Sequence, residues 1–204
     1  MKMKKIQVSL TALALLLAFA MPASAQKFHY GIKAGINGAV QSGIAEYYDN
    51  TNIRYGLTAG LVGNYHFNDN MMLQAELNYD QKGSHSPNVD THFDYISVPV
   101  LFDYSFGKTY HTKMSIHLNA GPYVAFLANA KKIETIDGVE HTTDLMDASH
   151  KAEFGALMGV GFRQPVGRHF LFWDVRLTLG LTHFQMNDNT TNNKMVSVTM
   201  GYEL

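Results

Sequence analysis

The segment His169–Thr182, HFLFWDVRLTLGLT, carries side chains of two chemical kinds at alternating positions. The odd positions from Leu171 to Leu181, Trp173 among them, are apolar, whereas Asp174 and Arg176 lie at even positions. Successive side chains of a β-strand point to opposite sides, so this pattern predicts a two-faced strand. A helix would place both charged residues in its apolar stripe. The segment is also longer than the usual strand of about 5–6 residues, and it matches the roughly 9–11 residues that cross a bilayer at a tilt.

The same alternation recurs along the chain and predicts an all-β fold, an eight-stranded antiparallel up-and-down transmembrane β-barrel. The strands are expected near Phe28–Val40, Ile53–Phe67, Met71–Lys82, Phe93–Phe106, Thr112–Leu127, Glu153–Gln164, His169–Thr182 and Lys194–Leu204. Short connections are expected at Asn68–Asn70, Gly107–His111 and Pro165–Arg168. They alternate with long polar loops at Gln41–Asn52, Gly83–His92, Ala128–Ala152 and His183–Asn193.

Alternation alone does not show which face points outward, so a soluble barrel with an apolar lumen, as in lipocalins, is the alternative. Glycine favours a polar lumen, because inside a narrow barrel it leaves room for large side chains from other strands. Ten of the 17 glycines lie on the polar face, namely Gly31, Gly35, Gly56, Gly60, Gly121, Gly155, Gly159, Gly161, Gly180 and Gly201. The apolar face is therefore expected to contact lipid.

Aromatic residues of the apolar face gather toward the strand ends, as in the two interfacial girdles of membrane barrels. One girdle is expected from Phe28, Tyr30, Tyr65, Trp173 and Tyr202, and the other from Tyr55, Tyr79 and Phe126. Ordinary aromatic-rich strands would not sort their aromatic residues by depth.

The N-terminal segment Met1–Ala25 has the three parts of a secretory signal peptide. Lysines form a positive head, Leu10–Ala20 is an apolar run too short to span a membrane, and Ala23-Ser24-Ala25 is a small-residue cleavage site. Cleavage is expected between Ala25 and Gln26, which leaves residues 26–204 as one barrel domain.

The composition excludes several classes of protein. The chain has no cysteine and therefore no disulfide, and its formal net charge of −1 argues against nucleic-acid binding. No second apolar segment approaches the roughly 20 residues of a transmembrane helix. No motif indicates a cofactor.

Two consecutive predicted strands carry a family resemblance. The run Leu73–Ser84, LQAELNYDQKGS, and the run Asp94–Phe106, DYISVPVLFDYSF, resemble the hallmark pair of the PorT-like outer-membrane β-barrel family. Further similar positions cover essentially the whole mature chain. This sequence departs from the family at Ser97, where glutamate is frequent, and at Asp103, where lysine is frequent. The resemblance implies the fold and the outer membrane, but it implies an activity only weakly, because the member linked to protein secretion represents one branch.

The alternation of loop lengths predicts an orientation in the cell outer membrane. Short turns of such barrels face the periplasm and long loops face outward, so both termini are expected to be periplasmic. Gly201, Tyr202 and Leu204 resemble the C-terminal signal read by the barrel-assembly machinery, with leucine in place of the commoner phenylalanine. That machinery and outer-membrane lipid are the partners expected during assembly and residence.

A charged network is expected inside the lumen. Lys33, Glu76, His117, Asp174 and Arg176 fall at similar depths on four strands and all point inward. Two acids and two permanent bases cancel, as buried charges must. Glu76 and Asp174 are predicted to bridge Lys33 and Arg176 across the barrel and to block water. Separate local hydrogen bonds along each strand are the alternative.

An eight-stranded barrel is narrow enough for side chains to fill its lumen. The sequence therefore favours a structural or accessory protein that acts through its loops, with a protein partner at Ala128–Ala152, over a narrow pore for small solutes. A third alternative is an outer-membrane lipid-modifying enzyme, whose candidate residues are His85, Ser86, His92, Ser149, His150 and His183. Nothing in the sequence orients these pairs, so no catalytic residue is assigned. A metal site at His141 and His150 with Asp144 or Asp147 is equally weak, because loop spacing fixes no geometry.

Overall fold

A computed structural model describes residues 28–42, 52–86, 89–106, 114–136, 139–146, 151–182, 184–186 and 189–204. These ranges contain ten strands. The strands are β1 (Phe28–Ser42), β2 (Asn52–His66), β3 (Met71–Ser86), β4 (Val89–Phe106), β5 (Ser115–Ile136), β6 (Val139–Asp144), β7 (Ala152–Val166), β8 (His169–Gly180), β9 (Phe184–Met186) and β10 (Asn189–Glu203). Within the described ranges, no helix has the length and apolar character needed to span a membrane.

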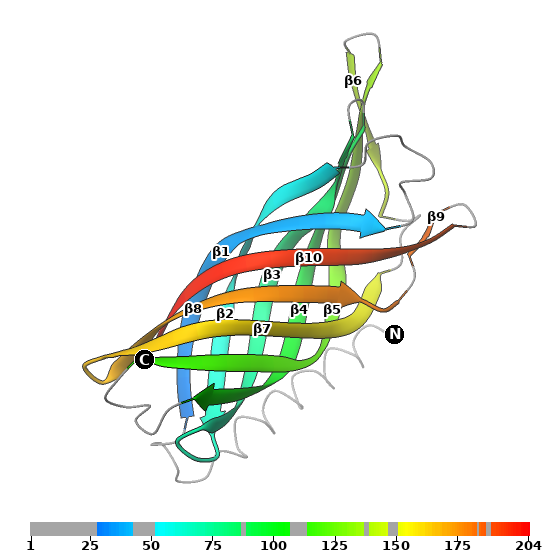
Figure 1. Cartoon of the computed structure of the whole chain (residues 1–204). Coiled ribbons are helices and arrows are strands. Elements are labelled where there is room, and N and C mark those ends of the chain that lie inside the picture. Colours follow the sequence, from blue (N-terminus) through cyan, green and yellow to red (C-terminus); the bar gives the residue numbers. More distant parts are fainter. Residues whose placement is uncertain are drawn as a thin grey trace, which may run out of the picture.

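Eight of these strands close into an antiparallel barrel (Figure 1). Their order is β1-β2-β3-β4-β5-β7-β8-β10, and β1 pairs with β10 from Gly31↔Glu203 to Ser42↔Asn192. The two remaining strands are additions to this barrel, because β6 pairs with β5 and β9 pairs with the start of β10. The predicted eight-stranded up-and-down barrel is confirmed.

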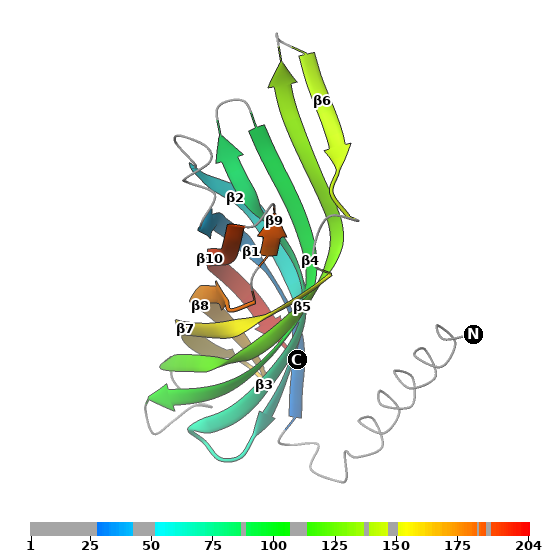
Figure 2. The ribbon, with the colours of Figure 1, turned by 90° about the vertical axis from the view of Figure 1, so that its right-hand side faces the viewer.

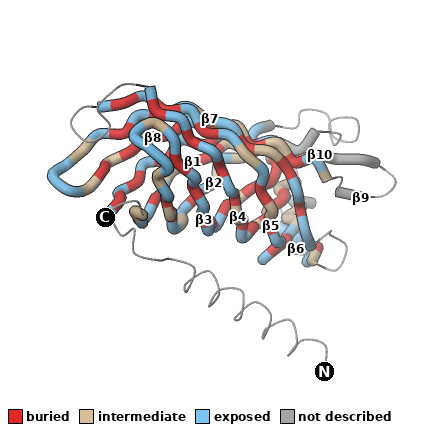
Figure 3. Tube along the Cα trace, turned by 90° about the horizontal axis from the view of Figure 1, so that it is seen from below, coloured by how far each residue is buried: buried red, intermediate tan, exposed pale blue. Residues whose placement is uncertain are grey.

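Burial alternates along the strands, as Figure 3 shows. In β8 the even positions Phe170, Phe172, Asp174 and Arg176 are buried, whereas Val175 between them is 49% exposed. The predicted polar face lines the lumen. Aliphatic and aromatic side chains form the outer wall, which is the arrangement that lipid requires of a barrel.

The barrel has two unlike ends. Short turns lie at one, which we call the short-turn end: residues 67–70 join β2 to β3, and Gly167 and Arg168 join β7 to β8. Gly167 has a φ of 68°, which a two-residue hairpin turn favours and other residues rarely adopt. The predicted connection Gly107–His111 lies outside the described residues.

At the opposite end, which we call the hairpin end, β3, β4, β5 and β6 continue beyond the barrel as two hairpins (Figure 2). The prediction of long loops at Gly83–His92 and Ala128–Ala152 was wrong over most of their length. Ser86 pairs with Val89, and Glu134 pairs with both Val89 and His141. Residues 140–144 are exposed on both faces, and most side chains of the two hairpins are polar, so their sequence lacks the alternation on which the assignment depended.

The lumen also contains apolar side chains that the sequence analysis did not assign to it. A cluster of buried residues on β4, β5 and β7 includes Phe93, Leu101, Leu127 and Leu157. Leu145, just after β6, packs into the same cluster, and its N–H donates to the carbonyl of Ala130 at 3.0 Å. The chain after β6 therefore turns back onto the inner surface of the barrel.

Candidate functional site

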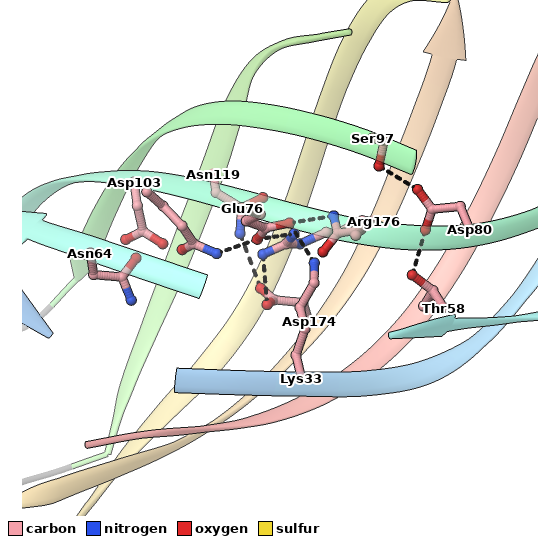
Figure 4. Close-up of polar contacts among 12 residues, drawn as sticks. Lys33, Thr58, Asn64, Glu76, Asp80, Ser97, Asp103, Asn119, Asp174 and Arg176 are labelled. Carbon is pink, nitrogen blue, oxygen red and sulfur yellow. Dashed lines mark hydrogen bonds and ion pairs between the residues drawn. The ribbon is translucent and has the colours of Figure 1, made fainter. Parts of the chain in front are cut away.

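The structure brings together the five lumen residues proposed from the sequence, which we call the central cluster. Figure 4 labels four of them, Lys33, Glu76, Asp174 and Arg176. The five side chains come from four strands and meet inside the lumen: Lys33 from β1, Glu76 from β3, His117 from β5, and Asp174 and Arg176 from β8. All five are at most 5% exposed.

Glycines on a neighbouring strand make the space for these side chains. Gly161 pairs with His117 on one side and Asp174 on the other. A Cβ atom at Gly161 would lie 2.6 Å from Asp174 Oδ1 and 2.7 Å from His117 Cε1. Gly159 pairs with Arg176, whose Cγ would lie 2.7 Å from an added Cβ. Glycines opposite charged residues are therefore a sequence signal of a crowded polar lumen.

Glu76 forms ion pairs with two bases that come from two other strands. Lys33 Nζ donates to Oε2 at 2.5 Å, and Arg176 Nη1 donates to Oε1 at 2.7 Å. The amides of Gln74 and Asn78 on the same strand also donate to this carboxylate, at 2.5 and 2.8 Å. With four donors, the carboxylate is satisfied at both oxygens, as a buried charge requires.

Asp174 forms the second half of the cluster. Arg176 Nη2 donates to Oδ2 at 2.9 Å, so the guanidinium bridges the two carboxylates. His117 Nε2 lies 2.8 Å from Oδ1, and Asn119 Nδ2 donates to the same oxygen at 3.0 Å. Side-chain contacts therefore connect β1 to β3, β3 to β8 and β8 to β5, so the cluster links four strands of the barrel across the lumen.

A second ion pair, which the sequence analysis missed, lies toward the hairpin end, and we call it the upper cluster. Lys82 Nζ is 2.6 Å from Glu153 Oε1, and the Tyr123 hydroxyl donates to the same oxygen at 2.6 Å. Asn193 Nδ2 donates to the other oxygen. Lys82 Nζ also lies 4.8 Å from the ring centroid of Tyr95, within cation–π range. Lys82 continues the inward polar series of β3, a signal that was available in the sequence.

A third group lies near the short-turn end. Arg163 Nη2 donates to Glu203 Oε1 at 3.0 Å, and Asn64 Nδ2 donates to the same oxygen at 2.7 Å. Asp103 is fully buried beside this group, with Arg163 Nη1 at 3.9 Å and His117 Nε2 at 3.8 Å. Asp103, where the family often has lysine, thus links the third group to the central cluster electrostatically.

Ser97, the other departure from the family pattern, has a hydrogen-bond partner in the lumen. Ser97 donates its hydroxyl to Asp80 Oδ2 at 2.5 Å, and Thr58 donates to the other oxygen at 2.5 Å. Two hydroxyl donors thus satisfy Asp80, and no base contacts it within hydrogen-bond distance in the described part of the chain. A glutamate at residue 97 would place a second carboxylate against Asp80.

Side chains leave little space beside the central cluster. A cavity lined by Lys33, Asp80, Tyr123, Arg176 and Thr178, among others, has a volume of about 10 Å³. That volume is about the space of one water molecule. The central and upper clusters, with the apolar residues around them, leave no room there for a hydrated ion.

The aromatic residues proposed as girdles lie on the outer surface: Phe28, Tyr30, Tyr65, Trp173 and Tyr202 toward the short-turn end, and Tyr55, Tyr79 and Phe126 toward the hairpin end. Phe28 pairs with Tyr65 on the neighbouring strand. Tyr79 and Phe126 flank Ile96 in one row across β3, β4 and β5. That these rows mark the membrane interfaces remains a prediction. The cleavage site Ala25–Gln26 lies outside the described residues.

The residues considered for catalysis or metal binding do not converge within the described part of the chain. His85 Nδ1 contacts Asp90 on the β3–β4 hairpin, but the nearby Ser84 hydroxyl bonds to Thr91 on the other face. His92 Nδ1 contacts Arg54 Nη2 at 2.7 Å, and burial, followed by the Arg54 charge, lowers the pKa of His92. The described ranges hold no group of three or more His, Cys, Asp or Glu placed to bind a metal. Asp147, Ser149, His150 and His183 lie outside them, and the Ser86 side chain is not described.

Comparisons with known proteins agree with this architecture. The family model "Outer membrane protein beta-barrel domain" matches residues 24–185. The structure is similar to Neisserial surface protein A, with a TM-score of 0.55 and 13% identity over 87% of this chain and 96% of that one. It is also similar to the outer membrane protein OprG from Pseudomonas aeruginosa, with a TM-score of 0.50 and 12% identity over 87% and 96%. No curated protein matches the sequence. At these identities, the structural similarities show the fold alone.

Proposed function

The chain belongs to the outer membrane protein beta-barrel domain family, and on this basis we propose that it is a closed barrel that acts through its projecting hairpins. The packed lumen carries this proposal. The cross-barrel ion pairs, and the small volume of about 10 Å³ in the cavity beside Lys33 and Arg176, favour a structural or accessory membrane protein over a pore for small solutes.

The proposed orientation places the short-turn end and both termini in the periplasm and the hairpin end outside the cell. Barrels of this kind have short periplasmic turns and longer extracellular connections. The hairpins β3–β4 and β5–β6 would then project beyond the outer leaflet. Lys131, Glu140, His141 and Asp144 on the β5–β6 hairpin are exposed, which suits a surface that contacts another protein in water.

The edge strand β6 is the part of this surface best suited to a partner. Among the described residues β6 pairs with β5 alone, which leaves its other edge available. Residues 140–144 are exposed on both faces. Exposed edges present a row of backbone donors and acceptors to which an extended segment of another chain can pair.

A shortened β5–β6 hairpin tests this proposal. Replacing Ile133–Thr142 by Asn-Gly joins the paired residues Lys132 and Thr143 through a two-residue turn and keeps Leu145 in its buried position. Capture of partner proteins from intact cells should be lost in this variant, while heat-modifiable gel mobility remains that of a folded barrel.

The matched control shortens the other hairpin, replacing His85–Asp90 by Asn-Gly between Ser84 and Thr91. Partners should be retained in this control. Equal capture by both shortened proteins and the full chain would contradict a role for the β5–β6 hairpin.

The finer family resemblance suggests what such a partner does. The segments LQAELNYDQKGS and DYISVPVLFDYSF are similar to the PorT-like barrels, of which one branch is linked to protein secretion. We propose an accessory role in secretion on that ground. Deleting the protein should then reduce the amount of secreted protein in the medium, and the variant with the shortened β5–β6 hairpin should not restore it.

A further inference from the structure

The lipid-facing wall contains a groove that the proposed function does not use. It lies on β1, β2, β8 and β10, which are adjacent in the barrel (Figure 1), and has a volume of about 320 Å³. The lining is largely apolar, with Ile36, Ile53, Leu177, Val196 and Val198 among its residues. Its shape and position follow from the register of these strands.

Gly38 forms the floor of the groove. It pairs with Tyr55 of β2 on one side and with Val196 of β10 on the other, and Val196 in turn pairs with Leu177 of β8. The row Tyr55–Gly38–Val196–Leu177 therefore lacks a side chain at its second position. Tyr55 is 79% exposed and forms one wall instead of covering the glycine.

Among the described residues, Gly63 is the other outward-facing glycine of the barrel wall. The ring of Phe28 covers it, because a Cβ atom built there would lie 3.3 Å from Phe28 Cζ. At Gly38, an added Cβ atom would lie 2.9 Å from the Cγ2 methyl of Ile53 and 4.0 Å from Cε1 of the Tyr55 ring, so one methyl group borders the glycine and no ring lies over it. The groove therefore lies over a glycine that is bordered by Ile53 and is not covered by an aromatic ring.

A lysine side chain, Lys194, lies at one end of the groove. Lys194 pairs with Val40, two residues beyond Gly38 toward the hairpin end, and it is exposed. At roughly 3.3 Å per residue, its Cα lies within about 7 Å of the row of the glycine along the strand. It is the one Lys, Arg, Asp or Glu among the described outward-facing positions of these four strands. A lysine above an apolar wall extends its ammonium to the headgroup level.

We propose that this groove binds one acyl chain of a lipid with an anionic phosphate headgroup, and that Lys194 pairs with the phosphate. The apolar lining accepts the chain, the missing side chain at Gly38 gives it depth, and the charge at the end selects the headgroup. The site requires only that the wall contacts lipid, so it holds in either orientation of the barrel.

Native mass spectrometry of the full-length protein in detergent tests the proposal, with phosphatidylglycerol and zwitterionic phosphatidylcholine as probes at equal concentration. The wild type should retain phosphatidylglycerol preferentially. Lys194→Gln should weaken phosphatidylglycerol binding roughly fivefold, the effect of one lysine near an anionic surface, and leave phosphatidylcholine binding unchanged.

Filling the groove should act on both lipids. Gly38→Leu should reduce retention of phosphatidylglycerol and phosphatidylcholine alike, whereas Gly63→Leu is the matched control and should change neither. Equal lipid retention by the two leucine variants, or an unchanged headgroup preference in Lys194→Gln, would overturn the site. Lys194→Gln alters only an exposed side chain, so it decides the question even if Gly38→Leu does not fold.

Discussion

The barrel body and the projecting hairpins are held together in different ways. In the body, Arg176 and Glu76 are 100 residues apart, and Asn64 and Glu203 are 139 apart, yet each pair is hydrogen-bonded across the lumen. In the hairpins some side-chain contacts are local, such as His85 with Asp90 and Lys132 with Glu134, and His92 reaches only the neighbouring strand β2 through Arg54. A defect in the body should therefore affect the whole barrel, whereas a defect in a hairpin should remain local.

The largest effect is expected from Glu76→Ala in the central cluster. The substitution leaves Lys33 and Arg176 buried without the carboxylate that both contact, and breaking a buried pair costs about 3–5 kcal/mol. The free energy of unfolding, measured from the loss of heat-modifiable mobility, should fall by that amount.

A double-mutant cycle with Lys33→Met sharpens this test. Removing both partners should cost less than the two single effects added, with a coupling energy of about 0.5–3 kcal/mol. Strict additivity would show that packing, and not the ion pair, holds β1 to β3.

The same arginine placed in the two regions should have unlike effects. Val198 is 48% exposed on the outer wall and pairs with Ile36 and Val175, far from either end of the barrel, so Val198→Arg should cost about 2–4 kcal/mol. Thr142 lies exposed on β6, and Thr142→Arg should change stability by less than about 0.5 kcal/mol. Equal losses of folded protein after reconstitution would contradict the assignment of one region to lipid and the other to water.

The smallest effect concerns protonation in the β3–β4 hairpin. Burial, with the neighbouring Arg54, lowers the pKa of His92 below its ordinary value of about 6.5. The neutral ring is the form that contacts Arg54, so its stabilising contribution is present above the unfolded pKa and is lost as the pH falls through the lowered value. An NMR titration should place the pKa of His92 below 6.5.

Replacing Arg54 separates the two causes of this shift. Arg54→Gln should move the pKa of His92 partway back toward its ordinary value, because burial remains. An unchanged pKa would mean that the contact with Arg54 does not form in solution.

Sequence reasoning succeeded in the body because each strand there contacts two different solvents. Asp174 and Arg176 alternate with Val175 and Leu177 since one face meets the lumen and the other meets the apolar surroundings. Lys33, Glu76, Asp174 and Arg176 lie at similar distances along their strands from the short turns. That similarity was enough to predict that they meet in the lumen.

The same reasoning failed in the hairpins, because most of their side chains are polar and apolar residues do not alternate with polar ones there. Lys131, Glu134 and His141 therefore suggested a loop, although backbone pairing continues through them. The ion pair of Lys82 with Glu153 was missed for a related reason, since both residues lay at the expected strand ends. The residues of the predicted strands were grouped by their distance along the strand from the short turns. Lys82 and Glu153, at the far ends of their predicted strands, were not included in that comparison.

The central claim is that side chains close the lumen, and single-channel recording in planar bilayers tests it most directly. The purified wild-type barrel, with folding verified by heat-modifiable mobility, should produce no conductance steps above the lipid baseline across the accessible range of voltage. Steady unitary steps that scale with the number of inserted barrels, and that change in size in Glu76→Ala, would contradict the closed lumen and establish a pore.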